Sequence, residues 1–84
     1  VPALAVEVRS EGDYGRSAER LMASKRAEYF EAGTAIVWDV DPEAKTITKH
    51  QKDAAPVVFG AGSQAEAEPV LPNWRLDVDE IFRT

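Results

Sequence analysis

Apolar and polar positions near the start of the chain follow a pattern that predicts a β-strand over residues 3–8. In a strand, positions 4, 6 and 8 face one side, and positions 3, 5 and 7 face the other. All six positions hold Ala, Leu or Val except Glu7. Because both faces are largely apolar, we expect this strand to lie inside a sheet that is covered on both sides.

A helix is expected after the first strand. Turn-forming residues fill positions 10–15, and the pattern then predicts a helix over residues 17–32 that ends at Gly33. Either Ser17 or Asp13 is expected to cap the N-terminus of this helix. At about 100° per residue, one side of the helix carries an apolar stripe that consists of Ala18, Leu21, Met22, Tyr29 and Ala32.

The rest of the chain is richer in strand signals. Residues 34–40 and 46–50 predict two strands, and the turn-forming residues between them indicate a β-hairpin. Residues 57–59 predict one more short strand. The spacing of Asp77 and Glu80 resembles a capping box, which predicts a short helix near the end of the chain.

Composition limits the class of protein. With 84 residues, the chain is long enough for one domain, over residues 1–84, and too short for two. The absence of cysteine excludes disulfides and thiolate metal sites and favours a cytoplasmic protein. No apolar run approaches the roughly 18–20 residues of a membrane span, so no membrane partner is expected. The net charge of −5 argues against a protein that coats DNA non-specifically, but it allows an acidic metal site that acts on nucleic acid.

Lys25 lies in the middle of the apolar stripe of the predicted helix. A buried ammonium group is costly unless it is paired, so the head group must reach solvent, meet a carboxylate or lie at a wet cleft. A helix that follows a strand packs back across that strand, which allows Lys25 to point at Glu7.

Glu7 is the one charged residue on an otherwise apolar strand. It can face solvent at a sheet edge, pair with Arg9, or lie at a cleft. A strand carboxylate and a lysine from the next helix are the parts of a hydrolytic metal site. In such a site the carboxylate binds Mg²⁺ or Mn²⁺, and the ammonium group stabilises charge or orients the attacking water.

The order of several short motifs resembles a known family. The motifs are Glu7-Val8-x-Ser10, Lys25-x-x-x-Tyr29-x-x-x-Gly33, Trp38-x-Val40-Asp41-Pro42 and Val70-Leu71-Pro72, followed by Leu76 and Ile81-Phe82. Together they cover nearly the whole chain and resemble the Uma-two family of restriction endonucleases. That family belongs to the PD-(D/E)XK nuclease superfamily, so the resemblance implies an α/β fold with a mixed central sheet flanked by helices.

The same resemblance implies an activity, the hydrolysis of DNA phosphodiester bonds with Mg²⁺ or Mn²⁺ as cofactor. Glu7 matches the acidic metal ligand of the family's strand, and Lys25 matches the lysine that this family carries on the helix. These two residues are the candidate catalytic residues. Arg9 stands where the wider superfamily keeps its lysine. Because arginine stays protonated, Arg9 could bind a phosphate but would serve poorly as a base.

The chain also departs from the superfamily pattern. Members are about twice as long, so the chain resembles the C-terminal half of such a protein and is expected to form a partial domain. Relatives carry another acidic ligand on an earlier strand, and often an Asp where this chain has Ala3. We therefore expect the chain alone to be inactive. The alternatives are a non-catalytic interaction module with the same fold and a homodimer in which two chains complete one sheet.

Other polar and aromatic residues are assigned structural roles. Asp39 could be a second metal ligand, but the simpler interpretation is that it faces solvent or pairs with a basic side chain of the next strand. His50 is expected on the surface, because the sequence places no nucleophile and orienting acid beside it. Trp38 and Trp74 are expected to pack in the core and against the C-terminal segment, since no basic residues interleave with them.

Overall fold

The computed structural model describes residues 1–83, which form two β-sheets and two helices. Thr84, the last residue of the predicted domain, lies outside the described residues. In chain order the elements are β1 (Leu4–Val8), α1 (Arg16–Glu31), β2 (Ile36–Asp41), β3 (Thr46–Gln51), β4 (Val57–Phe59), β5 (Gln64–Glu66), β6 (Arg75–Asp77) and α2 (Val78–Ile81).

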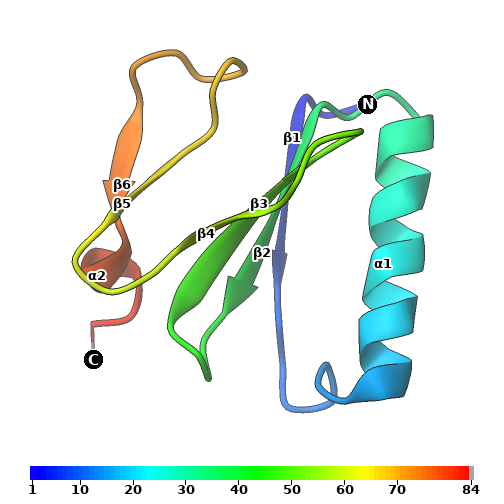
Figure 1. Cartoon of the computed structure of the whole chain (residues 1–84), viewed down its shortest axis with the longest axis horizontal. Helices are drawn as coiled ribbons and strands as arrows, with labels where there is room; N and C mark the ends of the chain where they lie inside the picture. Colours follow the sequence, from blue (N-terminus) through cyan, green and yellow to red (C-terminus); the bar gives the residue numbers. More distant parts are fainter. Residues whose placement is uncertain (84) are drawn as a thin grey trace.

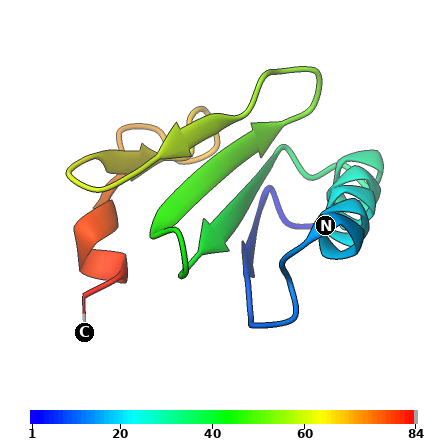
Figure 2. The same cartoon turned by 60° about the horizontal axis from the view of Figure 1, so that its bottom comes forward.

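The main sheet is mixed, with the strand order β1-β2-β3-β4. Strands β1 and β2 are parallel, whereas β2–β3 and β3–β4 are antiparallel hairpin pairs. Parallel neighbours need a crossover connection, and α1 provides it. Helix α1 covers one face of the sheet, and the β5–β6 hairpin and α2 lie on the other (Figures 1 and 2). The predicted α/β fold with a mixed sheet flanked by helices is thus confirmed.

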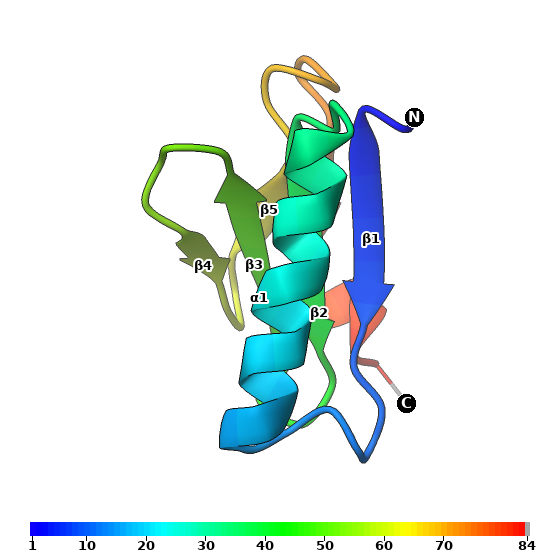
Figure 3. The ribbon, with the colours of Figure 1, turned by 90° about the vertical axis from the view of Figure 1, so that its right-hand side faces the viewer.

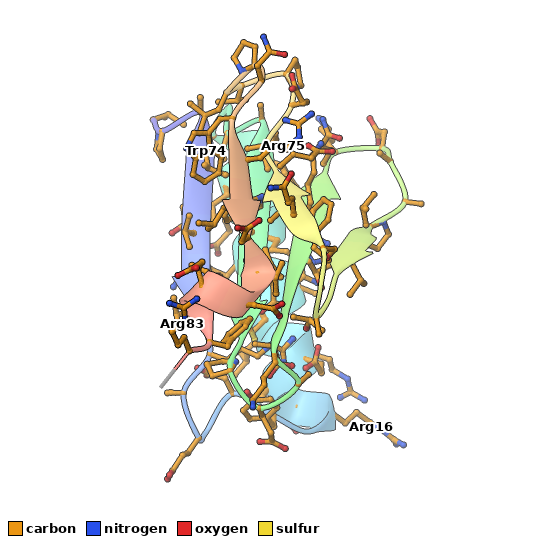
Figure 4. All side chains as sticks on the ribbon, turned by 90° about the vertical axis from the view of Figure 1, so that its left-hand side faces the viewer. Arg16, Trp74, Arg75 and Arg83 are labelled. Carbon is orange, nitrogen blue, oxygen red and sulfur yellow. The ribbon has the colours of Figure 1, made fainter. Side chains whose placement is uncertain are left out.

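The main apolar core lies between the sheet and the β5–β6 hairpin. Its buried members are Ile36, Trp38, Val40, Ile47, Ala65, Ala67 and Val78. The indole Nε1 of Trp38 donates a hydrogen bond to the carbonyl oxygen of Glu66 at 3.1 Å. Trp74, on the hairpin side in Figure 4, packs against Trp38 with ring centroids 5.6 Å apart. Both tryptophans therefore serve packing, as the sequence predicted.

A buried ion pair attaches the β5–β6 hairpin to the sheet. Lys49 Nζ of β3 lies 2.6 Å from Glu66 Oε1 of β5, and the lysine side chain is buried. The sequence pattern did not predict either hairpin strand, because each has three residues and no run of β-branched side chains. Fully buried Ala65 shows that tertiary packing, rather than local propensity, defines this hairpin.

Strand β1 corrects one expectation from the sequence. Within residues 1–83 it is an edge strand, paired with β2 alone, and its outer side is open in Figure 3. Val6 and Val8 are 51% and 62% exposed. They lie on the same face of the sheet as Trp38 and Val40 of β2, which are buried against the β5–β6 hairpin. The prediction of a strand covered on both sides is therefore wrong for the described residues.

Helix α1 matches its predicted range to within one residue but not its predicted caps. Gly15 occupies the N-cap, and no side chain caps the helix. Asp13 instead accepts hydrogen bonds from the backbone amide and hydroxyl of Ser10, which hold the preceding turn. The helix terminates at Gly33, as predicted, where a φ of 110° favours glycine.

The predicted C-terminal helix is present as α2, but the predicted capping box is not. Asp77 is the N-cap residue and makes no side-chain cap hydrogen bond. Its carboxylate instead accepts a hydrogen bond from Gln64 Nε2 at 2.8 Å, across the β5–β6 hairpin. Neither helix in residues 1–83 has the length and apolar character needed to cross a membrane.

The core assignment predicts a large stability difference between two aliphatic residues. Ile47 is fully buried, whereas Leu21 of α1 is 72% exposed. We expect Ile47→Ala to lower the free energy of unfolding by about 2–5 kcal/mol and Leu21→Ala to change it by less than about 0.5 kcal/mol. Urea denaturation measures both values, and losses of equal size would contradict this core.

Candidate active site

The structure brings Glu7 and Lys25 together. Lys25 Nζ lies 3.2 Å from Glu7 Oε1 and donates a hydrogen bond to Glu7 Oε2 at 3.3 Å. Glu7 lies on the face of β1 that is turned toward α1, and the helix passes over the neighbouring strand β2, beside β1 (Figure 3). The predicted meeting of the strand carboxylate with the helix lysine is therefore observed.

Tyr29 is a third member of this cluster. Its hydroxyl donates a hydrogen bond to Glu7 Oε1 at 2.8 Å. Lys25 and Tyr29 are four residues apart, so they lie on the same face of α1, one turn from each other. Sequence reasoning assigned Tyr29 to the apolar stripe and missed this contact, although its spacing from Lys25 was a usable signal.

An open cleft of about 200 Å³ lies between α1 and the sheet beside this cluster. The Lys25 side chain is 58% exposed and that of Glu7 is 24% exposed, so both are accessible from solvent. Within residues 1–83, the residues that line the cleft are Glu7, Val8, Gly12, Asp13, Ala18, Leu21, Met22, Lys25, Arg26, Val37 and Asp39.

The charges of the cluster are mutually stabilised. The hydrogen bond to Glu7 raises the pKa of the Lys25 ammonium group, and the negative charge of Glu7 acts in the same direction. The same hydrogen bonding raises the pKa of the Tyr29 hydroxyl. Both groups therefore remain protonated donors at neutral pH, and neither is suited to act as a base in this arrangement.

Arg9 belongs to a separate network at the end of β1. Its Nε and Nη2 donate hydrogen bonds to the two carboxylate oxygens of Asp39 at 2.9 and 2.8 Å, and both side chains are only 8% exposed. The guanidinium group also contacts the Glu19 carboxylate of α1 and lies over the Tyr14 ring. These hydrogen bonds raise the pKa of Arg9 above its ordinary value. Because its donors are engaged, the expected phosphate-binding role of Arg9 has no support in this arrangement.

The placement of Asp39 resolves an open alternative from the sequence. Asp39 pairs in register with Glu7 and points to the same face of the sheet, but both of its oxygens accept hydrogen bonds from Arg9. Asp39 thus pairs with a basic side chain, as predicted, but the partner comes from the end of the first strand rather than from the next strand along the chain. Glu19, which completes this network, had no distinguishing signal in the sequence.

His50, which the sequence predicted to be a surface residue, is partly exposed. It pairs in register with Val37 of β2, and its Nε2 atom is buried without a hydrogen-bond partner among residues 1–83. Burial lowers the pKa of His50, so the ring is neutral at pH 7.

Within the described part of the chain, no three His, Asp or Glu side chains are grouped so that they could hold a metal ion. Mg²⁺ commonly binds through one or two carboxylates, keeps several waters and takes further oxygens from phosphate groups. Glu7 fits the role of one such carboxylate, because it lies at the cleft and is partly exposed. Asp39 does not fit, since Arg9 binds both of its oxygens.

A model of the Uma2 family, described as "Putative restriction endonuclease", matches residues 1–79. The chain belongs to the Uma2 family. The resemblance to the Uma-two family that its motifs carry is thereby confirmed. No curated protein matches this Uma2 chain.

Among solved structures, the Uma2 chain is similar to a protein from Anabaena variabilis ATCC 29413, described as "a putative nuclease belonging to DUF820". The two share 16% sequence identity, with a TM-score of 0.77. The match covers 95% of this Uma2 chain and 43% of the other protein, so this chain spans less than half the length of that structure. At this identity the likeness shows a shared fold.

The Arg9 network of this Uma2 chain predicts an asymmetric effect on stability. We expect Arg9→Ala to lower the free energy of unfolding by about 3–5 kcal/mol, because it leaves the buried carboxylate of Asp39 unpaired. Arg83→Ala is the matched control, since Arg83 pairs with Glu80 at an exposed site, and it should cost less than about 0.5 kcal/mol. Chemical denaturation measures both variants, and a small loss for Arg9→Ala would show that the network is not stabilising.

Proposed function

We propose that this chain forms part of a metal-dependent DNA endonuclease of the Uma2 family. The observation that carries the proposal is the contact between Glu7 and Lys25 beside an open cleft. Membership of a family described as restriction endonucleases supports DNA as the substrate. A cytoplasmic location agrees with this substrate and stays a prediction.

Glu7 is proposed to hold Mg²⁺ or Mn²⁺ through its carboxylate. When bound, the ion supplies positive charge that polarises the phosphate. A complete site requires oxygen donors in addition to Glu7, which is why the 84-residue chain by itself is predicted to be inactive. The chain spans 43% of the similar solved structure, so the activity belongs to the proposal for the whole protein.

Lys25 is proposed to contact the phosphate or to orient the attacking water. A lysine carries a compact positive charge on a flexible stem, and this one is more than half exposed at the cleft. Arg26 also lines the cleft and adds positive charge next to Lys25. Arg16 extends from the start of the same helix in Figure 4. The cleft lining also carries the carboxylates of Glu7, Asp13 and Asp39, so these cations stand beside negative charge.

Plasmid nicking by the protein at its natural length tests the proposed roles. We expect Glu7→Gln and Lys25→Met each to lower the nicking rate in Mg²⁺ or Mn²⁺ by about 10²–10³-fold, because each removes a charge from the reacting centre. Glu31→Gln and Lys52→Met are controls at exposed positions away from the cleft, and they should retain activity.

Three outcomes of this assay contradict the proposal in different ways. Full activity of either site variant would show that the residue has been assigned the wrong role. Activity without a divalent cation would show that the reaction does not depend on a metal ion. A wild-type protein that does not nick DNA would favour the alternative, a non-catalytic interaction module with the same fold.

We also propose that two copies of the chain pair through the open edge of β1. This edge has five residues, whereas the other free edge, β4, has three. The exposed Val6 and Val8 lie along β1 and would be covered by a second copy. Unpaired strand edges of this kind readily accept a further strand.

Sedimentation equilibrium tests this dimer. We expect the wild-type chain to sediment as a dimer, and the double variant Val6→Lys/Val8→Lys to sediment as a monomer, because lysine on an edge strand opposes pairing. Val58→Lys is the control, since Val58 is equally exposed on the β4 edge. A wild-type chain that stays monomeric at high concentration would exclude the dimer.

A further inference from the structure

The ammonium group of Lys25 occupies a particular place on the Glu7 carboxylate. Its distances to the two oxygens are nearly equal, 3.2 Å to Oε1 and 3.3 Å to Oε2. The positive charge therefore bridges both oxygens of the carboxylate. A divalent cation that uses this carboxylate competes with the ammonium group for the same negative charge.

Tyr29 binds the same carboxylate independently of Lys25. Its hydroxyl donates to Oε1 at 2.8 Å, which is shorter than either contact of Lys25. A hydrogen bond to a charged acceptor is among the stronger kinds in proteins. Glu7 therefore keeps one fixed donor when the lysine moves away.

Lys25 itself is held weakly. Among residues 1–83, Glu7 is its one hydrogen-bond acceptor, and the lysine side chain is 58% exposed. Lys49 gives the contrast within the same chain, because its side chain is 7% exposed and its Nζ lies 2.6 Å from Glu66. An exposed ion pair contributes little net stability, so Lys25 can leave Glu7 at small cost.

We propose that Lys25 is a place-holding cation on Glu7. It neutralises the carboxylate while no divalent cation is bound, and Mg²⁺ or Mn²⁺ held by Glu7 would displace it from the two oxygens. Tyr29 holds the carboxylate in both states. The inference rests on the proposed function and adds to it the order of events at the site: the ammonium group becomes available to a phosphate only after the metal has entered.

Isothermal titration calorimetry with Mn²⁺, on the protein at its natural length, tests this exchange without relying on activity. We expect Lys25→Met to bind Mn²⁺ about three- to tenfold more tightly than wild type, because the competing charge is gone. The same variant should nick DNA at least about 100-fold more slowly. Tighter metal binding combined with slower cleavage is the signature of a place-holder.

Lys25→Arg separates displacement from a simple change of charge. Arginine keeps the charge but binds a carboxylate through two parallel hydrogen bonds, so it should be harder to displace than lysine. We expect Lys25→Arg to bind Mn²⁺ several-fold more weakly than wild type. An effect of charge alone would leave this variant equal to wild type and would overturn the proposal.

Tyr29→Phe and Tyr14→Phe form a matched pair. Each removes a hydroxyl that donates to a carboxylate, Glu7 in the first case and Asp41, at 2.6 Å, in the second. We expect Tyr29→Phe to weaken Mn²⁺ binding, in both the wild-type and the Lys25→Met background, and Tyr14→Phe to leave it unchanged. Equal effects of the two variants would show that the hydroxyl at Glu7 has no special role.

The outcomes distinguish this inference from the nuclease proposal. If Lys25→Met binds Mn²⁺ no more tightly than wild type while Glu7→Gln and Lys25→Met both abolish nicking, the place-holder is wrong and the nuclease assignment stands. If Lys25→Met binds more tightly but the wild type does not nick DNA, the place-holder stands and the nuclease is wrong. If Glu7→Gln still binds Mn²⁺ as wild type does, Glu7 is neither the metal ligand of the proposed nuclease nor the carboxylate for which Lys25 and the metal compete.

Discussion

Helix α1 is held on the sheet by polar contacts with the β1 segment and by the half-buried part of its apolar stripe, where Ala18 and Met22 line the cleft together with buried Val37. No residue of α1 is buried, and Leu21 in its predicted apolar stripe is largely exposed. Two side chains on the same face add polar contacts: Arg9, just after β1, contacts Glu19 near the N-terminal end of the helix, and Glu7 contacts Lys25 and Tyr29 further along. The Arg9–Glu19 and Glu7–Tyr29 contacts set the helix against the sheet at two points, and the cleft lies beside Glu7.

The same attachment makes the candidate site. The main core is on the opposite face of the sheet, where Ile36, Trp38 and Ile47 pack against the β5–β6 hairpin. Stability is therefore supplied mainly on one side, and the side that faces α1 can carry carboxylates and cations that an apolar core would exclude. A flexible, exposed lysine next to a partly exposed carboxylate is acceptable there, because neither group has to give up all of its hydration.

Sequence reasoning succeeded where one residue type contradicted its surroundings. Lys25 in an apolar stripe and Glu7 in an apolar strand each required a partner, and the strand-to-helix connection made each the partner of the other. The strands that follow the helix were predictable because their β-branched residues are bounded by turn residues. The β5–β6 hairpin was not, since its short strands are defined by packing on Trp38 and by the Lys49–Glu66 pair. The burial of the His50 Nε2 atom and the exposure of β1 depend on which elements lie next to them, and the local sequence pattern contains no such information.

Arg9 and Lys25 differ in how firmly they are bound, and the proposed function uses this difference. Arg9 stands at the strand position where the resemblance places a lysine, and its planar group satisfies both oxygens of Asp39 while it contacts Glu19. Such a group stabilises the fold but is too firmly bound to follow a reacting phosphate. In the proposed function, a mobile positive charge must then come from another residue. The first element that can reach the Glu7 carboxylate is the helix that follows the strand. Placing the lysine on an exposed helix face separates the structural cation from the mobile one, so that a change in the position of Lys25 need not disturb the pair that holds β1, β2 and α1 together.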